Sequence, residues 1–277
     1  MNYNSAAALR AFLDENGLGM RKKFGQNFLI NPGARQALVD ALDAGAGEAV
    51  WEVGPGLGAM TSLLLEKGLS VRAFEVDGGF ARVLRELFAG NDAFTLVEGD
   101  VLKTWPSQPP APYLLGNLPY NIAATLLAGL IEQGRLFRRM VVTVQREVAQ
   151  RMAAVPGSAA YSSFSVLCAS AYRVKPLLVI KSASFYPRPN VDSQGVLLEL
   201  RDDAARTLPA IFYPLLRQLF SSRRKTAKNN LAGFMGLSVA AAEEALARCG
   251  IDGGRRAEAC AFEEFVSLAK TLEDMGV

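Results

Sequence analysis

The chain has 277 residues, of which 50% are hydrophobic and 21% charged, so it can bury a large core and we expect one large domain plus a smaller one. It contains no histidine, which excludes Ser-His-Asp and Cys-His hydrolases, His-ligated metal enzymes and the zinc nucleobase deaminases. The formal net charge of +3 does not by itself indicate a nucleic-acid partner.

Cysteine usage and the N-terminal residues predict the compartment. Cys168, Cys249 and Cys260 lie far apart and show no paired spacing, which favours reduced thiols over a disulfide framework or a zinc site. The N-terminal stretch lacks the basic and apolar regions of a signal peptide, and no apolar run approaches the roughly 20 residues that span a bilayer. We therefore expect a cytoplasmic protein that is not associated with a membrane.

Strand and helix patterns alternate between residues 34 and 145. Strands are predicted at 49–54, 70–77, 94–100, 111–117 and 138–145, and helices at 33–42, 59–68, 78–90, 121–134 and 146–152. Such alternation indicates βαβ units, and hence an α/β fold in which helices cover both faces of a parallel sheet.

The alternation ends after residue 160. A helix is predicted at 160–172, strands at 173–180 and 195–202, and further helices at 208–220, 240–250 and 262–273. The two strands flank a proline-rich loop, a pattern that suggests antiparallel edge strands, and only helical patterns follow them. We therefore predict a large α/β domain over residues 1–203 and a small α-helical domain over residues 204–277.

A glycine-rich turn, "WEVGPGLGAMT" at 51–61, follows the first strand of this series. Gly54 permits a tight turn and Gly56 lets a ligand approach the backbone. Together with Ala59 these glycines satisfy the dinucleotide fingerprint, and Glu75 lies about 20 residues further on, where a ribose-binding carboxylate is expected. This turn alone fits both NAD and S-adenosylmethionine.

Three further features favour S-adenosylmethionine. Glu52 precedes the first glycine by two residues, and Asp100 ends the third strand, where a carboxylate can accept from an exocyclic amino group such as that of adenine. The fourth strand ends in the sequence "NLPY" at 117–120. No tyrosine is followed four residues later by lysine, so the usual proton donor of a dehydrogenase is absent. This order of features resembles a class I S-adenosylmethionine-dependent methyltransferase.

The "NLPY" motif is similar to the catalytic motif of methyltransferases that act on adenine N6. Together with "KKFGQNFL" at 22–29, "FYPRPNVDS" at 185–193 and "RRKTAKNNL" at 223–231, it makes the chain resemble the KsgA/Dim family of small-subunit (16S) rRNA adenine N6,N6-dimethyltransferases. The similarity runs from about residue 20 to the C-terminus.

This resemblance implies a Rossmann-like, mostly parallel seven-stranded sheet and a C-terminal helical domain that binds RNA. It also implies the reaction, which is transfer of two methyl groups to each of two adjacent adenines in a hairpin loop near the 3′ end of 16S rRNA. The substrate would be a late precursor of the small (30S) ribosomal subunit, and we expect the enzyme to act as a monomer.

The resemblance also implies the cofactor contacts, within an N-terminal segment (20–30) and at the strand ends. These contacts fall on Asn27, Leu29, Gly54, Glu75, Asp100 and Asn117. To them we add Gln26, which lies beside them, and Gly56 of the glycine turn as predicted cofactor-binding residues. The cofactor would be S-adenosylmethionine, with no metal. The first nineteen residues precede the motif region, and no function follows for them from the sequence.

The residues of the "NLPY" corner suggest how adenine N6 is activated. Pro119 fixes its own φ and holds Leu118 extended. If the Asn117 amide oxygen and the Leu118 carbonyl accept the N6 hydrogens, the nitrogen is drawn toward tetrahedral geometry and no strong base is needed. Tyr120 would stack on the extracted base and Phe185 would close its other side; the alternative roles are core packing for Tyr120 and a loop plug for Phe185.

Two short segments concentrate positive charge. We expect their cations to contact rRNA phosphates, the alternative being a solvated surface. They are Arg21, Lys22, Lys23, Arg223, Arg224, Lys225 and Lys228.

Two other functions are compatible with the sequence. One is a 23S rRNA adenine N6-methyltransferase of the macrolide-resistance type, which shares the fold and the corner motif. The other is a non-catalytic RNA-binding assembly factor built on the same fold.

Overall fold

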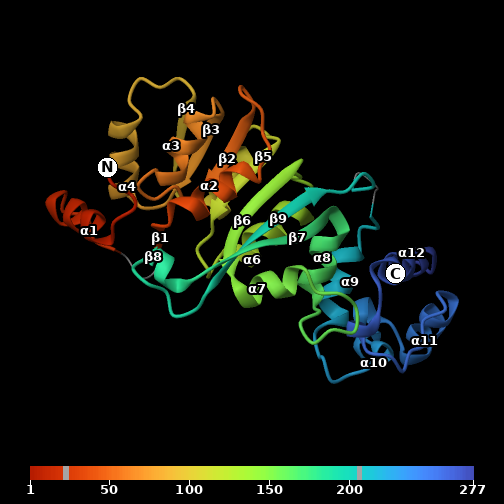
Figure 1. Ribbon diagram of the computed structural model, residues 1–277. Coiled ribbons are helices and arrows are strands. Elements are labelled where there is room, and N and C mark those ends of the chain that lie inside the picture. Colours follow the sequence, from red (N-terminus) through yellow and green to blue (C-terminus); the bar gives the residue numbers. More distant parts are fainter. Residues whose placement is uncertain (21–24, 205–207) are drawn as a thin grey trace. The chain divides into compact units, whose positions relative to one another are not determined.

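A computed structural model describes residues 1–20, 25–204 and 208–277. The chain divides into two compact units, Met1–Ala149 with Val174–Leu200 and Gln150–Arg173 with Arg201–Val277 (Figure 1). The break between Leu200 and Arg201 lies close to the boundary that the sequence predicts at 203 and 204. Residues 150–173, which the sequence places in the first domain, instead cluster with the C-terminal helices, because Tyr161 and Val166 belong to the hydrophobic core of the second unit.

The first unit is built on a seven-stranded sheet with the order β4-β3-β2-β5-β6-β9-β7. Its strands are β2 (Ala49–Val53), β3 (Ser70–Glu75), β4 (Phe94–Glu98), β5 (Tyr113–Asn117), β6 (Arg139–Gln145), β7 (Tyr172–Ile180) and β9 (Ser193–Leu200). The strands from β4 to β6 pair in parallel, and β9 pairs antiparallel with β6. The predicted α/β class is confirmed. Strand β9 is antiparallel to β6 as expected, but it is not an edge strand, because it lies between β6 and β7.

Helices connect these strands, as the alternating pattern predicts. They are α2 (Pro32–Asp40), α3 (Ala59–Glu66), α4 (Gly78–Leu87), α5 (Val101–Thr104), α6 (Ala123–Glu132) and α7 (Arg146–Met152). Side chains cap several of them: Asn31 Oδ1 accepts from Ala34 N at 2.9 Å, and Asp77 Oδ1 accepts from Gly79 N at 2.9 Å. Caps of this kind satisfy amides that have no partner within the helix.

The N-terminal region contains two elements that the sequence analysis does not predict. Helix α1 (Ala6–Glu15) packs Leu9 and Leu13 into a hydrophobic cluster with Phe80. Strands β1 (Phe28–Leu29) and β8 (Phe185–Tyr186) form a separate antiparallel pair. The "GQNFL" and "FYPRPNVDS" motifs therefore lie side by side and pair as neighbouring strands.

The second unit is helical. Its helices are α8 (Ser163–Ala171), α9 (Phe212–Leu219), α10 (Ala227–Leu231), α11 (Val239–Arg248) and α12 (Phe262–Asp274). Phe212 packs edge-on against Phe262, and Phe220 lies against Phe265. The three helices predicted after Arg201 are confirmed as α9, α11 and α12. Across the described ranges, no helix has both the length and the apolar character required to cross a membrane.

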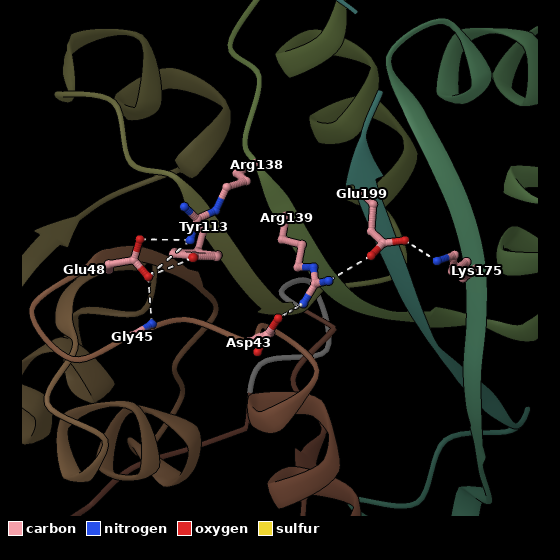
Figure 2. Close-up of polar contacts among 8 residues, drawn as sticks. All are labelled: Asp43, Gly45, Glu48, Tyr113, Arg138, Arg139, Lys175 and Glu199. Carbon is pink, nitrogen blue, oxygen red and sulfur yellow. Dashed lines mark hydrogen bonds and ion pairs between the residues drawn. The ribbon is translucent and has the colours of Figure 1, made fainter. Parts of the chain in front are cut away.

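Polar side chains fasten the sheet at the amino ends of its parallel strands (Figure 2). Glu48 Oε2 accepts from Tyr113 Oη at 2.8 Å, and Glu48 Oε1 pairs with Arg138 at 2.9 Å. Arg139 bridges Asp43 and Glu199, each at 2.9 Å, and Lys175 also pairs with Glu199. This network joins β5, β6, β9 and β7 at the edge of the sheet opposite the carboxyl ends of the parallel strands.

Candidate active site

The carboxyl ends of β2, β3, β4 and β5 meet at one edge of the sheet. Because these strands are parallel, the residues that follow them face the same space. That space is a cavity of about 310 Å³. Every cofactor-binding residue predicted from the sequence lines it, namely Gln26, Asn27, Leu29, Gly54, Gly56, Glu75, Asp100 and Asn117.

The glycines of the turn are required by backbone conformation and by space. Gly54 has φ 72° and Gly56 has φ 59°, in the left-handed region that residues with a Cβ adopt at a cost. A Cβ on Gly56 would lie 2.9 Å from the Phe28 ring. The turn can therefore adopt this conformation beside the cavity only with glycine at these positions.

Glu75 is held at the end of β3 by backbone amides. Its Oε2 accepts from Gly56 N at 3.1 Å and its Oε1 from Asp77 N at 2.9 Å. Glu75 is 4% exposed, and this burial raises its pKa to about 7, although the two amides oppose the shift. A fixed acceptor in this position suits a pair of ribose hydroxyl groups.

A second carboxyl lies behind the turn. Glu52 is fully buried, and its Oε2 accepts from Thr61 Oγ1 at 2.6 Å. Burial raises the pKa of Glu52 to about 7, and the nearby Glu75 adds to the shift. Glu52 Oε1 has no hydrogen-bond partner among the described residues. Glu52 does not line the cavity, so it supports the turn rather than contacting a ligand.

Asp100 lies at the β4 side of the cavity. Its Oδ1 caps α5 by accepting from Leu102 N at 3.0 Å. Within the described part of the chain, nothing donates to its Oδ2. This oxygen is therefore available to an exocyclic amino group.

The "NLPY" corner leaves two acceptors open. Asn117 Nδ2 donates to the Asn27 carbonyl at 2.8 Å, which fixes the amide so that Oδ1 is its acceptor. Leu118 N donates to Thr143 O at 3.1 Å. No described residue donates to Asn117 Oδ1 or to the Leu118 carbonyl. Pro119 also lines the cavity.

The two aromatic residues predicted to hold a base differ in position. Tyr120 is half-buried, and its hydroxyl lies 2.7 Å from Ser193 Oγ. Burial raises the Tyr120 pKa. Phe185 is only 3% exposed and packs in the hydrophobic core with Leu29, its partner in the β1–β8 pair. The stacking role of Phe185 stays a prediction; it would require the ring to leave this core, whereas the alternative role as a loop plug would not.

Sequence reasoning missed several residues of the cavity wall, of which Tyr3 and Arg35 are two. Tyr3 Oη donates to Leu57 O at 3.0 Å, beside the glycine turn. Neither residue belongs to a motif. Their proximity depends on long-range packing of α1, for which a single sequence gives no signal.

The predicted RNA-binding cations lie in two regions. Arg21, Lys22 and Lys23 fall outside the described residues. In the second unit, Arg224 and Lys225 are exposed, whereas Arg223 pairs with Glu258 at 3.1 Å and Lys228 with Glu243 at 3.3 Å. Among the described residues, no group of three or more His, Cys, Asp or Glu side chains could hold a metal ion.

The mostly parallel seven-stranded sheet, the glycine turn and the acids at successive strand ends define a class I S-adenosylmethionine-dependent methyltransferase. The chain belongs to the ribosomal RNA adenine dimethylase family, whose model matches residues 17–274. It is thus an enzyme that methylates rRNA with S-adenosylmethionine.

Similar proteins agree with this assignment. "Ribosomal RNA small subunit methyltransferase A" of Treponema pallidum (strain Nichols) is 45% identical, with 98% of this chain and 97% of the relative covered. The protein of the same name from Treponema denticola is 44% identical, with coverages of 98% and 96%.

Solved structures share the fold. A dimethyladenosine transferase from Plasmodium falciparum has a TM-score of 0.78 at 24% identity, covering 89% of this chain and 98% of that one. The 23S rRNA methyltransferase ErmE has a TM-score of 0.67 at 22% identity, with coverages of 88% and 99%.

Proposed function

We propose that this enzyme transfers methyl groups to N6 of two adjacent adenines in the 3′-terminal hairpin loop of 16S rRNA and dimethylates both. Its substrate would be the small (30S) ribosomal subunit or a late precursor. The target is supported by the relatives named small subunit methyltransferase, at 45% and 44% identity over almost the full chain. The chemistry is supported by the acceptor pair at Asn117 and Leu118.

The orientation of the Asn117 amide is the observation that carries this proposal. Since Nδ2 is engaged by the Asn27 carbonyl at 2.8 Å, Oδ1 can accept one N6 hydrogen while the Leu118 carbonyl accepts the other. Adenine N6 is a poor nucleophile because its lone pair is delocalised into the ring. Two acceptors that favour a tetrahedral nitrogen restore the lone pair, and alignment of this kind contributes on the order of 7–11 kcal/mol in favourable cases.

The residues present fit the cofactor. Glu75 would accept from the ribose hydroxyls, Asp100 Oδ2 from the adenine amino group, and the Gly54–Gly56 turn allows close approach of the backbone. When bound, S-adenosylmethionine supplies the electrophilic methyl group. The product ammonium is acidic enough to lose its proton to water, so the chain needs no histidine for this step.

Other parts of the protein would hold the RNA. Tyr120 would stack on the extracted adenine, a contact worth roughly 1–3 kcal/mol. The basic residues of the second unit and of segment 20–30 would contact phosphates. Within this scheme residues 1–203 bind the cofactor and catalyse, residues 204–277 bind RNA, and the enzyme works in the cytoplasm as a monomer.

A 23S rRNA target is the second candidate, since ErmE shares the fold. ErmE is 22% identical to this chain, so its similarity bears on the fold alone, whereas the small-subunit relatives are 45% and 44% identical. A non-catalytic assembly factor would not require the open acceptors at Asn117 and Leu118.

Radiolabelled methyl transfer onto undermodified small and large subunits, assayed side by side, tests the proposal. We expect label in the small subunit at two adjacent adenines, approaching four methyl groups per subunit. Label in the large subunit alone would establish the 23S activity. Binding to the small subunit without any label would indicate the assembly factor.

A further inference from the structure

Arg35 is a buried cation in the wall of the cofactor cavity. The residue is 5% exposed and lies on α2, outside the recognised motifs. Burial lowers its pKa, which means that the charged guanidinium is held in a place that disfavours charge. A charge buried in this way is expected to have an ionic partner.

The protein supplies only neutral partners to Arg35. Its Nη1 donates to Leu29 O at 2.5 Å and to Tyr3 O at 3.4 Å, and its Nη2 donates to Asn4 Oδ1. No carboxylate forms an ion pair with Arg35 in the described ranges. A guanidinium has five N–H donors, so these contacts leave the Nε–H and one Nη2–H without an acceptor among the described residues.

The charged groups that line the cavity change from acidic to basic along the edge of the sheet. Asp100 follows β4, Glu75 ends β3, the glycine turn follows β2, and the sheet order places these strands side by side. The Tyr3 hydroxyl donates to the Leu57 carbonyl at the far end of the turn, and Arg35 donates to the Tyr3 backbone carbonyl. One end of the cavity therefore offers carboxylates and the other offers a guanidinium.

S-adenosylmethionine has the complementary order of groups. Adenine and ribose, which need acceptors, would lie at Asp100 and Glu75, so the amino-acid end extends past the glycine turn. That end carries the only anionic group of the cofactor. We infer that Arg35 binds the methionine carboxylate of S-adenosylmethionine through its unused N–H groups, as a specificity-determining residue of the cofactor site.

The competing role for Arg35 is a latch that holds Tyr3 and Asn4 against β1 and has no ligand contact. Both roles would make substitutions at Arg35 harmful, so loss of activity cannot separate them. The ligand can separate them, because S-adenosylhomocysteine and its decarboxylated form differ only in the carboxylate. This inference rests on S-adenosylmethionine as the cofactor, and tight binding of S-adenosylhomocysteine by the unaltered chain checks that basis independently.

Calorimetric titration of both ligands into the full chain and its variants tests the inference. Arg35→Met should weaken S-adenosylhomocysteine binding about 10- to 150-fold, the range for a hydrogen bond to a charged group, and change binding of the decarboxylated ligand less than about twofold. Arg10→Met, which removes an exposed arginine from α1, should change neither affinity.

Equal loss for the two ligands, or no loss for either, would overturn the inference. Arg35→Lys keeps the charge with fewer donors and provides a second variant if the methionine variant does not fold. Its loss should again be confined to S-adenosylhomocysteine and be smaller. If Arg35→Lys weakens both ligands alike, Arg35 acts as a latch and the carboxylate is bound elsewhere.

Discussion

Asn117 ends β5 with its amide nitrogen bound to the Asn27 carbonyl at 2.8 Å. We predict that Asn117→Ala lowers the single-turnover rate of methyl transfer at least about a hundredfold, because it removes an acceptor that matters most while N6 changes geometry. Affinity for S-adenosylhomocysteine, measured by calorimetry, should fall only a few-fold. A variant with a normal rate would show that N6 is not activated by this amide.

Two substitutions of Tyr120 distinguish stacking by its ring from a chemical role of its hydroxyl group. Tyr120→Phe keeps the ring and loses only the contact to Ser193, so it should retain most single-turnover activity. Tyr120→Ala loses the stacking surface and should lose most turnover. If the phenylalanine variant is as inactive as the alanine variant, the hydroxyl takes part in the reaction and the base-free mechanism is wrong.

Glu52 provides a pH-dependent prediction. Its pKa is raised from 4.5 to about 7, so the folded state binds its proton more tightly than the unfolded state. This contribution to stability is complete below pH 4.5 and is lost as the pH rises through 7. Glu52→Gln keeps the acceptor for Thr61 and removes the charge.

The Glu52→Gln variant should therefore be more stable than the parent at pH 8, by up to roughly 3 kcal/mol, and no more stable near pH 4.5. Urea unfolding at both pH values measures this difference, with the exposed Glu66→Gln as a matched control. An equal difference at the two pH values would contradict the assignment of the shift to Glu52.

At the scale of elements, the sequence predicts what depends on local pattern. The strands from 49 to 145 are found because their apolar runs alternate with amphipathic helices. The central strands β2, β5 and β6 are buried on both faces, whereas β4 at the edge of the sheet is partly exposed. Helix α1 and the β1–β8 pair are missed because they depend on distant partners, such as Phe80 for α1. The burial of Phe185 is missed for the same reason, because it depends on the pairing of this residue with the distant Leu29.

The candidate site follows the same division. Its acids and glycines could be predicted because parallel strands bring their carboxyl ends to one edge, whatever the details of packing. Arg35 and Tyr3 could not be predicted, because nothing in the sequence near either residue indicates that α1 folds back beside the turn.

Arg139 belongs to the polar network at the amino ends of the parallel strands, away from the cavity (Figure 2). It joins Asp43 and Glu199 at 2.9 Å each, and the side chains of Arg139 and Glu199 are only 25% and 21% exposed. Lys175 and Arg139 lower the pKa of Glu199. Partly buried, shared ion pairs contribute more than exposed single ones.

We predict that Arg139→Met lowers the free energy of unfolding by about 1–2 kcal/mol, measured in urea, since it leaves Glu199 with Lys175 alone. Arg10→Met breaks a pair whose side chains are each 74% exposed and should change stability by less than about 0.5 kcal/mol. Equal effects of the two substitutions would mean that the Arg139 network is no more than a surface pair.

At the scale of the whole molecule, the family match covers both compact units, since it runs from residue 17 to residue 274. The first unit carries the cavity and the second carries the cluster Arg223–Lys225. The ion pairs of the second unit distinguish the members of that cluster. Glu258 and the Ala159 carbonyl engage Arg223, whereas Arg224 and Lys225 are exposed and have no ion pair in the described part of the chain.

Salt-dependent binding to the small subunit therefore has a specific expectation. Arg224→Ala with Lys225→Ala should flatten the slope of log K against log salt concentration by about two units, one for each lost phosphate contact. Arg223→Ala should have a smaller effect, because its charge is already partly neutralised by Glu258. Lys270→Ala, an exposed cation on α12 of the same unit, is the matched control and should leave the slope unchanged. Filter-binding titrations from low to high salt measure these slopes, and an unchanged slope in the double variant would mean that the cluster is a solvated surface rather than an RNA-binding one.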